Sequence, residues 1–149
     1  MSENLKFKSY AKINLGLEVS GKRPDGFHEL ISVMQSIGLY DTLTISKSVD
    51  VAVDGDIPRD VPGPDLVRRA ADLLRKNIGH APGARLTLRK SIPIGAGLGG
   101  GSSNAACALI GLNKLWGANL SLQELEPLAA ELGSDVPFFL RGGTALAEG

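Results

Sequence analysis

The stretch that most limits what this chain can fold into is the glycine-rich run of residues 93–103, P-I-G-A-G-L-G-G-G-S-S. Residues 86–89 before it alternate like a β-strand, and residues 105–116 after it are apolar like a buried helix. A glycine-rich turn between a strand and a helix is typical of phosphate binding. Glycine lets the backbone approach an anion closely, and the first N–H groups of the helix face that anion. The sequence therefore predicts a phosphate-binding loop here.

Three other interpretations of this run are weaker. Gly95, Gly97 and Gly100 have the spacing of the dinucleotide-binding fingerprint. That fold needs an acidic residue after a second strand about 20 residues further on, but Glu124 and Glu126 lie in a helical segment. No Gly-Lys-Ser/Thr closes the run, so it is not a Walker loop. A flexible linker rarely joins a strand directly to an apolar helix, so a third type of nucleoside-triphosphate loop fits best.

Composition excludes several classes of partner. A length of 149 residues suits one domain with its own core. The 16 basic and 16 acidic residues balance, so nothing favours binding to nucleic acid or to a membrane surface. The single cysteine, Cys107, cannot form an internal disulfide and is predicted to be a small core residue. No apolar run approaches the roughly 20 residues of a membrane span. We therefore predict a cytoplasmic protein.

The first half of the chain is predicted to be mostly strands. Residues 6–19 alternate with a period of two, which places Lys12 and Asn14 on one face and aliphatic side chains on the other. A turn at residues 24–26 precedes a second strand that ends at Ile37. Residues 39–46 and 49–53 then favour a hairpin or meander, followed by a loop over residues 54–63.

The second half is predicted to be mostly helical. One helix starts at Pro64, has Asp65 in its first turn and ends at Gly79. Ser121 and Glu124 have the spacing of a capping box that starts another. Residues 133–137 start a further short turn, and residues 142–146 form a last strand. Strands followed by a helix, a strand and a helical run indicate the α+β class.

Three separate motifs resemble those of the GHMP small-molecule kinases. Residues 93–103 match that family's Pro-x-x-x-Gly-Leu-Gly-[Gly/Ser]-Ser-Ser signature, A-K-I-N-L at residues 11–15 its first motif, and L-G-S-D-V-P at residues 132–137 a third. The resemblance covers nearly the whole chain in unbroken order. It implies a two-layer fold like domain 2 of ribosomal protein S5, with helices on one face of a mixed sheet, and an N-terminal ATP-binding domain at residues 1–149.

The resemblance also implies catalytic and substrate-binding residues. Asp135 would be the catalytic base, and Lys12 would point into the active site with Asn14 beside it. The segment K-R-P-D-G-F-H at residues 22–28 resembles one that holds a cytosine ring in one branch of the family. There Phe27, in place of the usual tyrosine, would stack on the ring, and His28 would bond to its edge.

ATP and Mg²⁺ are the cofactors that the resemblance implies. The family usually has asparagine at the position of Asp65, where it touches the adenine; a carboxylate can accept from the adenine amine but cannot donate to a ring nitrogen. Either Ser102 or Ser103 could contact the metal. The predicted ATP-binding residues, besides Asp65, are Pro93, Ile94, Gly95, Ala96, Gly97, Leu98, Gly99, Gly100, Gly101, Ser102 and Ser103.

The implied reaction is ATP-dependent phosphorylation of a hydroxyl of a cytidyl diphosphate polyol, a step in isoprenoid precursor synthesis. The alternatives are a kinase for another small alcohol and a non-catalytic nucleotide-binding module. Members of the family continue into a second domain of similar size, whereas this sequence stops at Gly149. We therefore expect self-association through the surface which that domain would cover, weak nucleotide binding and slow or absent turnover.

Overall fold

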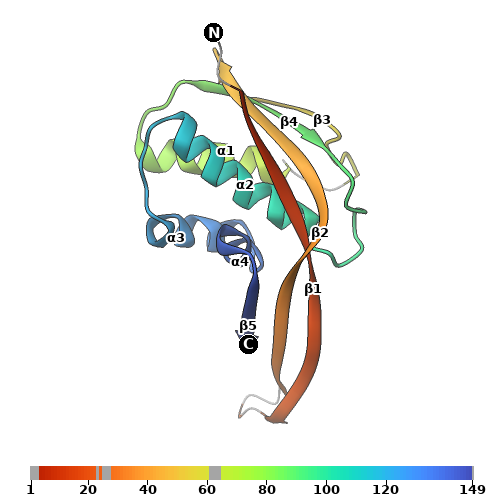
Figure 1. The fold of residues 1–149 in the computed structure, drawn as a ribbon. Coiled ribbons are helices and arrows are strands. Elements are labelled where there is room, and N and C mark those ends of the chain that lie inside the picture. The colour runs from red at the N-terminus through yellow and green to blue at the C-terminus, as the bar shows by residue number, and fades with distance from the viewer. Residues whose placement is uncertain (1–3, 23, 25–27, 61–64, 149) are drawn as a thin grey trace.

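A computed structural model describes residues 4–148 except residues 23, 25–27 and 61–64. Its two layers are a mixed sheet and a set of helices that cover one face of that sheet (Figure 1). This is the predicted α+β architecture. In chain order the elements are β1 (Asn4–Lys22), β2 (His28–Ser48), β3 (Ala52–Gly55), α1 (Leu66–Ile78), β4 (Gly83–Arg89), α2 (Gly100–Leu115), α3 (Leu122–Leu132), α4 (Val136–Arg141) and β5 (Thr144–Glu148).

The long strand β2 is the centre of the sheet. It pairs antiparallel with β1 along most of its length, with β4 through residues 42–48, and with β5 through residues 31–35. β3 lies at the far edge and pairs parallel with β4. The strand order is therefore β1-β2-β4-β3, with β5 beside the other half of β2.

Two strand predictions are wrong. β2 does not end at Ile37, because β1 pairs with it on both sides of Gly38. On its other edge, β2 pairs with β5 before this position and with β4 after it. Residues 49–53 do not form a hairpin with the preceding strand either. β3 pairs parallel with β4, and a parallel pair needs a crossover connection, which α1 supplies here.

The predicted alternation along β1 also breaks down near its middle. A register shift lies between Tyr10 and Lys12, so the consecutive residues Ala11 and Lys12 are both buried, with exposed fractions of 0% and 5%. Leu15, predicted to lie on the apolar face, is 47% exposed. The irregularity in β1 turns the lysine inward, so Lys12 is not a solvated strand residue.

Helix boundaries follow the predicted signals where the structure describes them. Asp65 caps α1 by accepting a hydrogen bond from the Arg68 N–H at 3.0 Å, and Gly79 ends that helix with a positive φ of 82°. Ser121 and Glu124 form the predicted capping box at the start of α3. Pro64 and most of the turn at residues 24–26 lie outside the described residues.

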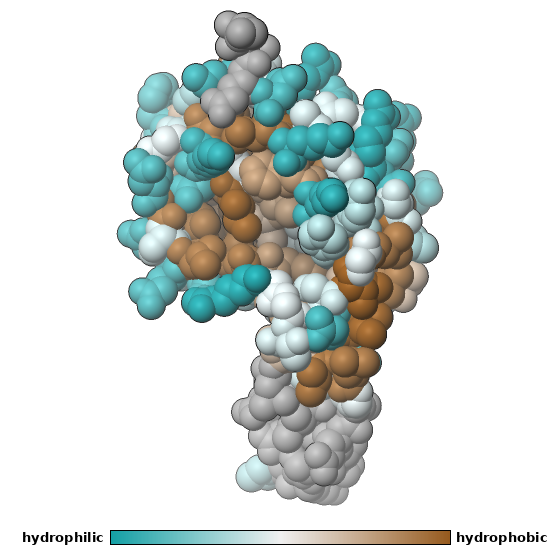
Figure 2. All heavy atoms as spheres, in the orientation of Figure 1, coloured by the Kyte–Doolittle hydropathy of each residue, from teal (hydrophilic) through white to brown (hydrophobic). Residues whose placement is uncertain are grey.

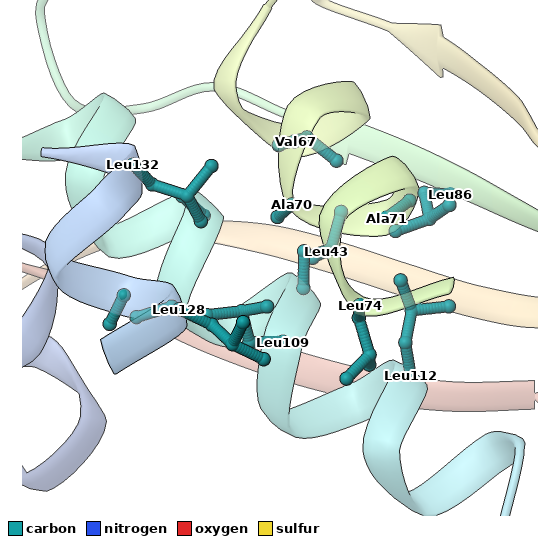
Figure 3. Close-up of a cluster of buried hydrophobic side chains, with 14 of the residues drawn as sticks. Leu43, Val67, Ala70, Ala71, Leu74, Leu86, Leu109, Leu112, Leu128 and Leu132 are labelled. Atoms are coloured by element: carbon teal, nitrogen blue, oxygen red, sulfur yellow. The ribbon is translucent and has the colours of Figure 1, made fainter. Parts of the chain in front are cut away.

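The core lies between the sheet and the helices, with α2 in the middle. The side of α2 that faces the sheet is rich in small residues, and a Cβ on Gly111 would meet side-chain atoms of Phe7 and Ile45. The helix therefore lies close to the strands. Figure 3 shows the leucine, valine and alanine side chains that meet there: Leu43 and Leu86 from the sheet, Val67, Ala70, Ala71 and Leu74 from α1, Leu109 and Leu112 from α2, and Leu128 and Leu132 from α3. Within the described part of the chain, no helix is long and apolar enough to cross a membrane.

Candidate active site

A cavity of about 580 Å³ lies where the glycine-rich run connects β4 of the sheet to α2. Its walls come from β1, the start of α1, the end of β4, the start of α2 and the residue before α4. Apolar side chains, the glycine-rich run and a few charged groups line it: Lys12, Pro58, Asp65, Leu66, Val67, Arg69, Leu88, Lys90, Pro93, Ile94, Gly95, Ala96, Gly97, Leu98, Gly99, Gly100, Gly101, Ser102, Asn104 and Asp135. Of the predicted ATP-binding residues, only Ser103 does not line the cavity.

The glycine-rich run has a backbone shape that requires glycine. Gly95, Gly97 and Gly99 have φ angles of 73°, 76° and 70°, in the left-handed region. α2 begins at Gly100, earlier than the sequence predicts, so the last part of the run is the first turn of that helix. Its cap is Gly99, and no side chain makes a capping hydrogen bond there. The N–H groups that open the helix are therefore not capped by a side chain and lie at the cavity wall.

Gly99 lies where three parts of the site meet. A Cβ at this position would be 2.7 Å from Cζ of Phe139 in α4 and 3.1 Å from Cγ of Lys12 in β1. The backbone N–H of Lys12 also donates to the carbonyl oxygen of Leu98 at 2.9 Å. The end of the run is thus bonded to β1 and lies against the Phe139 side chain of α4.

The two predicted catalytic residues line the same cavity. Lys12 comes from β1, and Asp135 immediately precedes α4. Asp135 makes no side-chain capping hydrogen bond to α4, so its carboxylate is not used as a helix cap. A buried cation and an acid from different elements therefore lie on the walls of one cavity beside the start of α2.

The other predicted site residues are placed differently. Asp65 lines the cavity while one of its oxygens caps α1. Asn14 is exposed on β1, does not line the cavity, and accepts a hydrogen bond from the Ser32 hydroxyl at 3.2 Å. Phe27 lies outside the described residues. His28 begins β2, and its side chain also lies outside what the structure describes.

The structure separates the two candidate metal-binding serines. Ser102 lines the cavity, whereas Ser103 is 2% exposed and accepts a hydrogen bond from the Ser9 hydroxyl at 2.8 Å. No group of three or more His, Cys, Asp or Glu side chains that could hold a metal occurs among the described residues.

A buried polar cluster beneath the loop was missed by the sequence analysis. It consists of Asp41, Lys90, Asn104, Ser9 and Ser103, and its centre is the carboxylate of Asp41 in β2, which is 0% exposed. Asn104 directly follows the glycine-rich run and Lys90 lies three residues before it, so their position was a usable signal. Asp41 lies far away in the sequence within an ordinary strand pattern, and nothing in the sequence connected it to the loop.

Four hydrogen bonds converge on Asp41. One carboxylate oxygen accepts the backbone N–H groups of Ser91 and Ile92, at 2.6 and 2.8 Å. The other accepts Lys90 Nζ at 2.6 Å and Asn104 Nδ2 at 3.0 Å. Burial by itself raises the pKa of this carboxyl, but these hydrogen bonds together lower the pKa below its ordinary value of 3.8. Asp41 is therefore ionised at neutral pH.

Comparison with known proteins decides the family. The GHMP kinases N terminal domain matches residues 65–143, which include the glycine-rich run and Asp135. The chain belongs to the GHMP kinase family. It is 54% identical over 145 residues to the 4-diphosphocytidyl-2-C-methyl-D-erythritol kinase of Pelotomaculum thermopropionicum, covering 93% of this chain and 50% of that protein. To the kinase of the same name from Thermotoga maritima it is 48% identical over 141 residues, covering 95% and 51%.

Solved structures of GHMP kinases have the same fold. A crystal structure of 4-(cytidine 5'-diphospho)-2C-methyl-D-erythritol kinase matches with a TM-score of 0.83 and 40% identity, covering 97% of this chain and 52% of that one. A homoserine kinase from Cytophaga hutchinsonii matches with a TM-score of 0.68 and 21% identity, covering 97% and 48%, which shows the shared fold alone. This GHMP kinase chain spans about half the length of the curated relatives it matches.

Replacing Gly99 with alanine should damage the site as well as the fold. A Cβ there would press on Phe139 and Lys12, whereas Gly117, at the other end of α2, has a similar φ of 63° and open space around it. Gly117→Ala should cost about 1–2 kcal/mol of stability because of the left-handed backbone, and Gly99→Ala should cost about 1–3 kcal/mol more because of the clash. Only Gly99→Ala should weaken MgATP binding, by about 10-fold or more, as measured by isothermal titration calorimetry. Equal affinities of the two variants would contradict this role of Gly99.

The stability contributed by ionised Asp41 should depend on pH in a defined direction. Because the pKa of Asp41 is depressed in the folded chain, its contribution to the free energy of unfolding is fully present above about pH 3.8. That contribution is lost as the pH falls through the lower, folded-state pKa. The difference in unfolding free energy between the wild type and Asp41→Asn should therefore be largest at neutral pH and shrink under acid conditions, as measured by urea unfolding. Asp54, whose pKa is lowered by hydrogen bonds from Thr87 and Arg85, is present in both proteins and cancels from the difference. A difference that does not change with pH would contradict the assignment.

Proposed function

We propose that this chain is the ATP-binding half of a kinase that phosphorylates the 2-hydroxyl of 4-diphosphocytidyl-2-C-methyl-D-erythritol. The observation that carries the proposal is that Lys12, Asp135 and the uncapped start of α2 line one cavity. The substrate is inferred from relatives of that name that are 54% and 48% identical to this chain over most of its length.

The phosphates of ATP would bind along residues 95–102. The uncapped first turn of α2 presents backbone N–H groups and the positive end of the helix dipole to the cavity. Such fixed donors stabilise the negative charge on the transferred phosphoryl group without reorganising during the reaction. The left-handed glycines bring this backbone to the ligand with no side chain in between.

The adenine would lie against the apolar part of the cavity, which Pro58, Leu66 and Leu88 line. Asp65 stands at the edge of this part. One of its oxygens is bound by the Arg68 N–H, which leaves the other to accept a hydrogen bond from the adenine amine. We propose this single contact in place of the two that an asparagine could make.

Asp135 would take the proton from the substrate hydroxyl as it attacks the γ-phosphorus of ATP. Its carboxylate makes no capping bond to α4, so it remains available as an acceptor. Lys12 would orient Asp135 by its charge. Because β1 and α4 hold the two side chains and both contact the glycine-rich run, base and phosphates would share one rigid frame.

Mg²⁺ fits the few oxygen ligands that the cavity offers. This ion is usually held by one or two carboxylates together with substrate phosphates and water. Ser102, rather than the buried Ser103, would contribute a hydroxyl, and Asp135 is a carboxylate that lines the same cavity. When bound, the ion would supply positive charge that offsets the charge on the transferred phosphoryl group.

The cytidyl end of the substrate would bind further along β1 and β2. Asn14 lies beyond the cavity on β1, between Lys12 and the segment 22–28 that is predicted to hold the cytosine. Its exposure on β1, beside Ser32 of β2, supports a contact with a substrate that extends along the two strands. The stacking role of Phe27 and the hydrogen bond from His28 remain predictions.

Self-association of the chain also remains a prediction. Figure 2 shows hydrophobic side chains among hydrophilic ones on the visible face and down along the lower strands. Tyr10, Leu15 and Leu39 in β1 and β2 are 41%, 47% and 38% exposed. Size-exclusion chromatography with light scattering would show whether apolar surface of this extent makes the chain associate.

The proposed reaction can be tested by coupled ADP release with a panel of alcohols. We expect the chain to bind MgATP weakly and to release ADP slowly, with 4-diphosphocytidyl-2-C-methyl-D-erythritol but not with homoserine, mevalonate or galactose. Turnover on one of those alcohols but not on the cytidyl substrate would contradict the substrate. Binding of MgATP without turnover on any alcohol would support the alternative of a nucleotide-binding module.

Removing the base should affect turnover and leave ATP binding nearly unchanged. Asp135→Asn should lower kcat by about 10²–10⁴-fold, the usual contribution of a general base. A matched control is Asp72→Asn, which removes an exposed carboxylate that is paired with Arg68 on α1. It should change neither kcat nor ATP affinity. Near-normal turnover by Asp135→Asn would contradict the assignment.

A further inference from the structure

The carboxylate of Asp41 connects three segments that are far apart in sequence. Asp41 itself belongs to β2, the N–H groups of Ser91 and Ile92 lie just after β4, and Asn104 lies in the first turns of α2. The two backbone groups directly precede the glycine-rich run. One buried side chain therefore holds both the start of the run and the helix that follows it.

The run is held at its far end as well. The Lys12 N–H binds the carbonyl oxygen of Leu98, and the Ser103 N–H binds that of Gly99. Between the start of the run, held by Asp41, and its far end at Leu98, the residues around Gly95 and Gly97 are exposed. A Cβ on either glycine would meet nothing within 4 Å. The direction of the backbone N–H groups in the middle of the run is thus set by the two ends, and Asp41 fixes the first.

Asp41 also fixes a cation in the cavity wall. Lys90 Nζ lies 2.6 Å from Asp41 Oδ2 and 3.2 Å from Asn104 Oδ1, and the lysine side chain is 10% exposed. A Cβ on Gly100 would lie 3.0 Å from this ammonium group. Lys90 is therefore held directly beneath the first residue of α2, where its charge adds to the positive end of the helix.

A purely stabilising role does not explain this arrangement. A buried ion pair can often be replaced by apolar side chains without loss of stability, because removing both charges from water offsets their attraction. An apolar residue at position 41 could not, however, accept the two N–H groups or hold Lys90 and Asn104. The directional bonds are what only the carboxylate supplies.

We propose that Asp41 is a positioning residue for nucleotide binding. Its carboxylate sets the geometry of the glycine-rich run, of Lys90 and of the first turns of α2, without contact between Asp41 and the ligand. The ligand itself, a nucleoside triphosphate, rests on the proposed function. The geometry that Asp41 sets can be measured in the absence of any ligand.

Asn substitution divides the four bonds into two pairs. In Asp41→Asn, the amide oxygen can still accept the N–H groups of Ser91 and Ile92, but the amide nitrogen would oppose the donors of Lys90 and Asn104. The reciprocal double variant Asp41→Asn with Asn104→Asp restores one carboxylate, one amide and a partner for the ammonium group. Asn104→Asp alone places two carboxylates side by side.

The first measurement is hydrogen–deuterium exchange without nucleotide. We expect Asp41→Asn and Asn104→Asp to raise exchange in peptides covering residues 90–103 while α3 stays protected. The double variant should recover most of the protection. The matched control is Asp54→Asn. Asp54 is likewise bonded to a cation, Arg85, and also to the Thr87 hydroxyl, but it is 40% exposed, and neither it nor these partners line the cavity. Unchanged exchange of residues 90–103 in both single variants would overturn the proposal.

The second measurement is the affinity for MgATP by calorimetry. Each single variant should bind about 10–100-fold more weakly, since hydrogen bonds to a buried charge are lost. The double variant should recover at least about half of that loss on a logarithmic scale, and Asp54→Asn should bind like the wild type. Wild-type affinity in the single variants would overturn the positioning role. If the wild type fails to bind MgATP, the proposed function fails, and the exchange measurement alone then decides whether Asp41 sets the loop.

Discussion

The site depends on how the first turn of α2 is held against the sheet. A helix start that binds anions must leave its N–H groups free, so it cannot be fixed by an ordinary side-chain cap. Here glycine caps the helix, and buried polar groups behind it do the fixing: Ser9 bonds to Ser103, and Asp41 bonds to Asn104. Asp41 also holds the residues after β4 that lead into the loop, so the fold and the site share this tightly bonded region.

Much of the fold could be predicted because its signals are local. The signals for helix boundaries depend only on neighbouring residues. Examples are the glycine that ends α1, the capping box at Ser121 and the spacing of apolar residues in α1. The strands were predicted less well. A glycine such as Gly38 often marks the end of a strand, yet β1 pairs with β2 on both sides of it. The register shift before Lys12 turns that side chain to the face opposite the one that simple alternation predicts. The length of β2 and the direction of the Lys12 side chain both depend on strand pairing between residues far apart in sequence, which a local sequence pattern does not predict.

The residues of the candidate site also fall into those that a local motif predicts and those that only the assembled fold shows. The glycine-rich run, Lys12 and Asp135 were named from motifs, and the structure brings all three to one cavity. Asp41 carries no local signal, because its role exists only once β2, the end of β4 and α2 are assembled. A buried aspartate in a strand would be costly without partners, and it becomes tolerable only through four donors from distant segments.

The charged groups at the cavity and behind its wall are held in different ways. Asp41 lies behind the wall, accepts its four bonds in the folded state and is held ionised, so it cannot serve as a proton acceptor near neutral pH. Asp135, by contrast, is not used as a helix cap and lines the cavity from the residue before α4. Lys90 is bound to Asp41, whereas Lys12 comes to the cavity from β1. A permanently paired carboxylate can position a loop, and only a carboxylate without such bonds can exchange a proton during turnover. The hydrogen bonds thus agree with the different roles proposed for the two aspartates.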